Sequence, residues 1–116
     1  MSYLKHFNLT RTSLLTFISE LDEEILDRNS KYFDNTIRWH IGNTLLMDEK
    51  LLFVSKASQK LPSEYSELFS SDKHVSDWTI DPPTLEELKK HLEEQQIRIN
   101  NFDDLCDICQ LLMGIN

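Results

Sequence analysis

Apolar residues at helical spacing, with few residues that break a helix, constrain the fold of this chain most. Leu14, Ile18, Leu21 and Ile25 recur every three or four positions, which is the spacing of one helix face. Only two glycines and three prolines occur in 116 residues, so few tight turns interrupt the chain. Composition and length together predict an all-α fold in which residues 1–116 form a single domain.

Two long helices are predicted in the first half of the chain. The first covers residues 9–29, where the acidic side chains fall mostly on the solvent face. The second covers residues 36–60, with Asp34 or Asn35 as its N-cap. Its apolar residues lie on two faces, which is typical of a central helix contacted from more than one side.

The second half is predicted to hold a covering segment and two further helices. Residues 61–83 are rich in Pro, Ser and Asp but also hold several large apolar residues, so we expect them to lie over the bundle and cover one end of it. Thr84 and Glu87 form a capping box that begins the third helix. The inward stripe of that helix is expected to comprise Leu85, Leu88, Leu92, Gln96 and Ile99. A short fourth helix is predicted after residue 101.

The charge balance argues against polyanionic partners. The net charge is −8, and the 12 basic residues are scattered among 20 acidic ones. Binding to nucleic acid or to an anionic membrane surface needs clustered Lys and Arg, so neither partner is expected. The sequence shows no apolar run of membrane-spanning length and no apolar signal-peptide core near the N-terminus. We therefore expect a cytoplasmic protein.

Cys106 and Cys109 form a Cys-x-x-Cys pair, but the surrounding pattern is helical. A thioredoxin-like pair would follow a strand, and a structural zinc site would need two further ligands at regular spacing. Packing on a helix face is therefore the favoured interpretation of both cysteines.

Three polar residues in the second helix are candidate metal ligands. His40, Asn43 and Asp48 lie near one face of that helix by their spacing. Together they would either coordinate a divalent metal or position a water molecule, with further ligands from another helix or another chain. The alternative is that His40 is a histidine at the edge of the core, bonded to a neighbour. The sequence contains no motif for a catalytic nucleophile and none for a phosphate loop, so we assign no catalytic or cofactor-binding residue.

Several spaced segments resemble the DinB/YfiT-like superfamily. Residues 35–43 (Asn-Thr-Ile-Arg-Trp-His-Ile-Gly-Asn) and Leu51-Leu52-Phe53 resemble its second helix. The covering loop and third helix are matched by residues 61–65, 68–69, 77–78, 83–88 and 94–99. The resemblance extends over about residues 10–100.

This resemblance implies an up-down-down-up four-helix bundle, often dimeric, here with a shortened fourth helix. Many members hold nickel or zinc with three histidines, one from the second helix and a His-x-x-x-His pair from the fourth. Asn43 stands at the second-helix ligand position, and no histidine follows Asn101. The expected protein is therefore DinB-like, without a cofactor, non-catalytic, and active through binding or homodimer assembly.

Two other functions remain open at the level of sequence. One is a metal-dependent DinB-family enzyme, resembling thiol transferases or hydrolases, with nickel or zinc bound around His40. The other is a small acidic partner or inhibitor protein, which the net charge of −8 would suit. The small-molecule ligand, if any, is unknown.

Overall fold

The computed structural model describes residues 3–28, 35–53 and 59–101. All regular secondary structure within these ranges is helical, which confirms the all-α prediction for the described part of the chain. The predicted fourth helix, with Cys106 and Cys109, lies outside the described residues.

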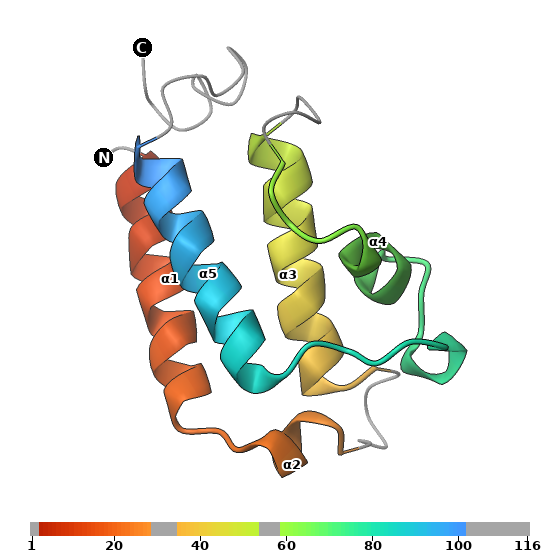
Figure 1. The fold of residues 1–116 in the computed structure, drawn as a ribbon. Coiled ribbons are helices and arrows are strands. Elements are labelled where there is room, and N and C mark those ends of the chain that lie inside the picture. Colours follow the sequence, from red (N-terminus) through yellow and green to blue (C-terminus); the bar gives the residue numbers. More distant parts are fainter. Residues whose placement is uncertain (1–2, 29–34, 54–58, 102–116) are drawn as a thin grey trace.

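Three long helices lie side by side and form the body of the fold (Figure 1): α1 (Tyr3–Ser19), α3 (Ile37–Leu52) and α5 (Leu85–Asn101). α3 and α5 run in the same direction, and α1 runs opposite to both. The antiparallel pairing of α1 with α5 is visible in the amide bonds between Asn8 and Asn100, both 2.8 Å long. A long connection crosses between the parallel helices α3 and α5.

The first predicted helix is in fact two helices, so the expectation of one helix over residues 9–29 is wrong. α1 ends at Ser19, and a separate short helix, α2, covers Glu23–Leu26. The carboxylate of Asp22 caps α2 by accepting the N–H of Ile25 at 3.1 Å. The break turns α2 across the end of the bundle (Figure 1).

Arg38 on α3 holds α2 in this position. Its guanidinium donates to both carboxylate oxygens of Asp27 at 2.9 Å and to Glu23 at 2.6 Å. It also donates to the carbonyl of Pro83, just before α5. Glu23 in turn accepts the N–H of Leu85. We call these groups the Arg38 cluster; it joins α2, α3 and the start of α5.

Both ends of α3 differ from the sequence-based expectation. The N-cap is Thr36 rather than Asp34 or Asn35, and its side chain accepts the N–H of Trp39. At the other end the helix stops at Leu52, well before residue 60. The Lys60 N–H donates to a carboxylate oxygen of Glu49 at 2.7 Å, so residue 60 lies beside the last turn of α3.

The covering segment packs over the bundle, as predicted, but its helix lies beside α3 rather than over one end of the bundle. It contains α4 (Glu64–Phe69) and a short 3-10 helix, η2 (Val75–Asp77). A Cβ atom at Gly42 would come within 2.4–2.5 Å of the Phe69 ring, so glycine is required for this close approach. The side-chain amide of Asn43 donates to the Phe69 carbonyl at 2.7 Å.

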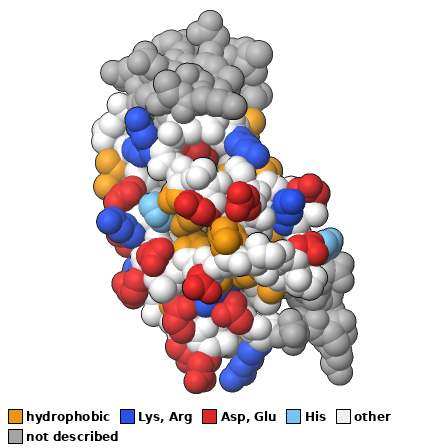
Figure 2. Space-filling model, turned by 45° about the vertical axis from the view of Figure 1, so that its right-hand side comes forward, with side chains coloured by type: hydrophobic (Ala, Val, Ile, Leu, Met, Phe, Trp, Pro, Cys, Tyr) orange, Lys and Arg blue, Asp and Glu red, His pale blue; other side chains and the backbone are white. Residues whose placement is uncertain are grey.

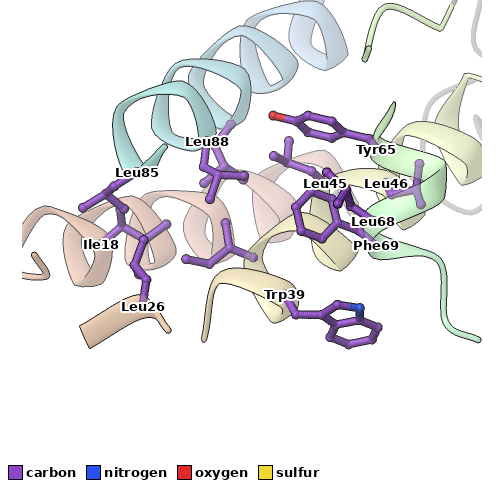
Figure 3. Close-up of a cluster of buried hydrophobic side chains, with 12 residues drawn as sticks. Ile18, Leu26, Trp39, Leu45, Leu46, Tyr65, Leu68, Phe69, Leu85 and Leu88 are labelled. Carbon is purple, nitrogen blue, oxygen red and sulfur yellow. The ribbon is translucent and has the colours of Figure 1, made fainter. Parts of the chain in front are cut away.

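The hydrophobic core is built from all of these helices (Figure 3). Its fully or almost fully buried members include Ile18, Leu26, Leu45, Leu68, Phe69, Leu88 and Leu92. One half of the predicted capping box of α5 is present, because the Thr84 hydroxyl accepts the Glu87 N–H at 3.2 Å. The inward stripe of α5 holds Gln95 at 0% exposure, whereas Gln96 is only half-buried, so the expected place of Gln96 in that stripe is corrected.

None of the helices in the described ranges combines the length and the apolar character that spanning a membrane demands.

Candidate functional site

Five polar side chains meet between the three long helices. Arg11 comes from α1, Asp48 and Glu49 from α3, and Gln95 and Arg98 from α5. We call them the interhelical polar cluster. Polar groups are rare in the core of so small a domain, and they persist there only when their hydrogen bonds are satisfied.

Arg11 lies at the centre of the interhelical polar cluster and is only 2% exposed. Its guanidinium donates to the Leu92 carbonyl at 2.9 Å, to Asp48 Oδ2 at 2.8 Å and to Gln95 Oε1 at 2.9 Å. The guanidinium also lies over the Phe7 ring, 4.9 Å from its centroid. One side chain of α1 is thereby bonded to both of the other long helices.

Glu49 is the most deeply buried carboxylate of the cluster, with 1% of its side chain exposed. Arg98 donates to both of its oxygens, at 3.0 and 2.8 Å. The Gln95 amide donates to Glu49 at 2.9 Å and to the Leu45 carbonyl at 3.0 Å. With the Lys60 N–H added, each oxygen of Glu49 accepts two hydrogen bonds from the protein.

The two carboxyl groups of the cluster are shifted in opposite directions. Burial raises the pKa of Asp48 and outweighs the attraction and hydrogen bond of Arg11, which lower it. Burial also acts to raise the pKa of Glu49, but the bonds from Arg98, Gln95 and the Lys60 N–H together lower it below its ordinary value. Burial lowers the pKa of Arg11, against the opposing effect of Asp48. Glu49 is therefore held as an anion, while the charge of Asp48 is disfavoured.

A cleft of about 330 Å³ opens beside Asp48 between α1 and α3. It is lined by His6, Phe7, Thr10, Arg11, Leu14, Thr44 and Asp48. The Asp48 side chain is 32% exposed, and one of its oxygens is bonded to Arg11. Chemically, the cleft offers a carboxylate whose charge is already balanced by a buried cation, which suits hydrogen bonding to a small polar group.

The predicted metal ligands point to different parts of the molecule. His40 is exposed, with its ring edge-on to Trp39 at a centroid distance of 5.1 Å. The Asn43 amide is directed to α4, where it bonds Phe69, and Asp48 is directed to α1, where it bonds Arg11. The structure does not bring these three side chains together.

The hydrogen bonds of these residues bear on the metal site that the DinB-like resemblance implies. The bond from the Asn43 amide to Phe69 orients this side chain towards α4. A cation at Asp48 would have to compete with the guanidinium of Arg11. Among residues 3–28, 35–53 and 59–101, no group of three or more His, Cys, Asp or Glu side chains is placed to hold a metal ion. The described residues do not fit a three-ligand site, and the absence of a bound metal from the whole chain stays a prediction.

Two central members of the cluster were not singled out from the sequence, although a signal for each was present. Arg11 continues the apolar spacing of Phe7, Leu14 and Ile18, and Gln95 lies three positions after Leu92. A polar residue within an apolar stripe indicates a buried group with a partner on another element. The sequence alone does not reveal which element supplies that partner.

The chain was compared with known proteins at three levels. No protein-family model, no curated protein and no solved structure matches it. The resemblance to the DinB/YfiT-like superfamily accordingly rests on the sequence segments alone.

Proposed function

We propose that the chain is a DinB-like helical bundle that binds no metal, is not an enzyme, and acts through binding or assembly. The directions of the three long helices support the bundle, because α1 opposes α3 and α5, and a long connection joins the parallel pair. An up-down-down order of this kind is what the sequence resemblance implies.

The bond between Arg11 and Asp48 carries the metal-free part of the proposal. The guanidinium is 2% exposed and lies 2.8 Å from the carboxylate. Its charge occupies the place that a divalent cation would take beside Asp48, and two cations so close together in a poorly solvated site would repel each other strongly. Asp48 thus serves to bind α1 to α3.

Elemental analysis of the purified full chain tests this proposal. We expect far less than one nickel or zinc ion per chain, and no rise in melting temperature when either metal is added. His40→Ala and the matched control His74→Ala, which removes another exposed histidine, should behave alike. About one tightly bound metal per chain, lost only in His40→Ala, would overturn the proposal.

Exposed apolar side chains support assembly into a homodimer. Leu9 and Phe17 on α1 are 59% and 51% exposed, and Ile97 on α5 is 61% exposed. Exposed apolar groups on two helices that pack against each other suit an interface between copies of one chain.

Native mass measurement over a range of concentrations tests the assembly. A dimer is expected for the wild type, and Phe17→Glu should shift it to monomer by placing charge in the interface. Leu51→Glu is the matched control, since Leu51 is a similarly exposed residue, at 57%, on α3. A wild-type monomer at about 100 μM would contradict the proposal, because stable dimers form well below that concentration.

A further inference from the structure

A second cleft, of about 310 Å³, shares no lining residue with the cleft beside Asp48. It is formed by α4, by the segment that leads into α5, and by the first turn of α5. The lining residues are Pro62, Glu64, Tyr65, Leu68, Asp81, Pro83 and Glu87. Figure 2 shows the face that carries this cleft, with apolar side chains in its middle and acidic side chains, interspersed with some basic ones, around them. The volume is sufficient for a small ligand group.

The rim of this cleft is acidic. Glu64, Asp81 and Glu87 come from three different segments and are all exposed. None of the described residues that line the cleft is Lys or Arg. None of the three carboxylates forms an ion pair with another residue in the described ranges. The rim therefore presents negative charge that the described chain does not neutralise.

Tyr65 provides an independent sign that the cleft takes a ligand. The residue is 3% exposed, and its hydroxyl has no hydrogen-bond partner among the described residues. Figure 3 shows the hydroxyl directed away from α4 towards α5, the helix that carries Glu87. Burial raises the pKa of the phenol, and the charge of Glu87 adds to this effect. A buried hydroxyl without a partner is unfavourable, and a polar ligand atom in the cleft would satisfy it.

The Tyr65 ring is held in place by its neighbours, so the hydroxyl cannot simply turn to solvent. The ring packs edge-on against Phe69 at 5.3 Å and against His91 at 5.5 Å between centroids. Phe69 is itself fixed by its close approach to Gly42. The hydroxyl of this lining residue is therefore a fixed, preorganised group on the α5 side of the ring.

We infer that this cleft binds an organic cation, namely a primary ammonium or guanidinium group on a short alkyl stem. The N–H groups of the cation donate to the Tyr65 oxygen and to the surrounding carboxylates, of which Glu87 is the one whose charge acts on the phenol. The alkyl stem contacts Leu68 and Pro83, which are buried lining residues. This apolar lining favours an organic cation over a hydrated metal ion. The inference does not depend on whether the chain is DinB-like.

Titration of the isotope-labelled full chain with n-butylammonium, followed by amide chemical shifts, tests the inference. We expect saturable shifts at Tyr65, Leu68 and Glu87. Tyr65→Phe, which keeps the ring, and Glu87→Gln, which keeps the shape, should each weaken binding about tenfold, the loss typical of a charge-assisted bond. The matched control Glu86→Gln removes the same charge from the neighbouring exposed residue and should change affinity less than about twofold.

Two further probes separate a cation site from a merely apolar pocket and from a merely acidic surface. n-Butanol has the same stem without the charge; equal binding of n-butanol would overturn the inference. Displacement of n-butylammonium by millimolar calcium chloride would also overturn it, because a simple acidic cluster would then account for the binding. Equal losses of n-butylammonium affinity in Glu86→Gln and Glu87→Gln would overturn the inference, as would the absence of saturable amide shifts in the wild type.

The source of the cation is distinguished by a fourth probe. Nα-acetyl-lysine-N-methylamide carries the same ammonium and stem on a peptide backbone. Binding equal to that of n-butylammonium identifies the side chain of a protein partner as an acceptable ligand. Binding of n-butylammonium alone identifies a free small amine.

Discussion

The fold holds two buried arginines, and they are bonded in different ways. Arg11, 2% exposed, lies between the long helices and bonds one carboxylate, Asp48, together with neutral acceptors. Arg38, 4% exposed, lies at the α2 end of the bundle and bonds two carboxylates, Glu23 and Asp27. The pKa of Arg38 is raised, whereas the pKa of Arg11 is lowered.

Hydrogen bonding to Asp27 is the largest influence on the pKa of Arg38 and raises it, with Glu23 adding to the effect against burial. Burial is the largest influence on the pKa of Arg11 and lowers it. Arg38 has more carboxylate partners and Arg11 lies deeper, and both differences act in the direction of the observed shifts.

The partners of the two arginines also differ in their access to water. The carboxylates of Glu23 and Asp27 are 50% and 51% exposed, whereas Asp48 is 32% exposed and the neighbouring Glu49 only 1%. A carboxylate that reaches water can be hydrated when its arginine is removed, and a buried one cannot. The cost of losing an arginine should therefore depend on the exposure of its partners.

Arg11→Met should give the largest effect. It leaves Gln95 and the Leu92 carbonyl without this donor inside the bundle and Asp48 without it at the wall of the cleft, so we expect a loss of about 3 kcal/mol in the free energy of unfolding. Urea unfolding followed by circular dichroism measures this loss. The double variant Arg11→Met with Asp48→Leu should recover most of it, because both partners of the pair are then apolar. A loss below about 1 kcal/mol would show that the bond is not a stabilising link.

Arg38→Met should cost less, about 2 kcal/mol, although it removes more ion-pair bonds. Glu23 and Asp27 regain water after the substitution, and the remaining cost comes mainly from the Pro83 carbonyl and the lost packing of α2. The same urea measurement provides the comparison. A loss as large as that of Arg11→Met would mean that the exposure of the partners does not set the cost.

The acid dependence of stability should separate Glu49 from Asp48. The folded-state pKa of Glu49 is lowered, so its contribution is present above the unfolded value of about 4.3 and is lost as pH falls through the folded value. The folded-state pKa of Asp48 is raised, so ionisation of Asp48 costs stability as pH rises above its unfolded value of about 3.9.

Between pH 5 and pH 3, the wild type should therefore lose more stability than Glu49→Gln, because only the wild type has the Glu49 carboxylate to protonate. It should lose less than Asp48→Asn, because the opposing titration is absent from that variant. Urea unfolding at each pH gives these differences, with Glu93→Gln, an exposed glutamate, as the control. Parallel pH curves for wild type and Glu49→Gln would contradict the assigned role of Glu49.

Lys90→Met should give the smallest effect. The Lys90–Glu94 pair is 3.9 Å long, and its side chains are 71% and 52% exposed. Exposed pairs of this kind contribute little, so a change within about 0.5 kcal/mol is expected in the same urea assay. A larger change would show that exposure is not the variable that separates the ion pairs of this fold.

Local signals predicted those parts of the fold that depend on neighbours in sequence. The start of α5 was predicted because Thr84 and Glu87 carry the whole capping pattern within four residues. The covering position of α4 was predicted because large apolar side chains in a long connection need burial. These features require no knowledge of distant partners.

Features that depend on distant partners were not predicted. Apolar spacing continues through Leu21 and Ile25, so it gives no indication that the helix breaks after Ser19. The break is stabilised by Arg38, which lies 11 positions beyond Asp27. The centre of the polar cluster depends on Arg11 and Gln95, which lie 84 positions apart, and only the fold brings these two side chains together.

The distance in sequence between bonded residues also affects the order in which the helices associate during folding. Asn43 and Phe69 are 26 positions apart, whereas Arg11 and Leu92 are 81 positions apart. Contacts that close a longer loop cost more chain entropy before the contact energy compensates for it. We therefore expect α3 and α4 to associate before α1 docks on α5. Arg11→Met should then accelerate unfolding in stopped-flow measurements while changing the refolding rate little. α1 would be the last helix to join the bundle and the first to leave it.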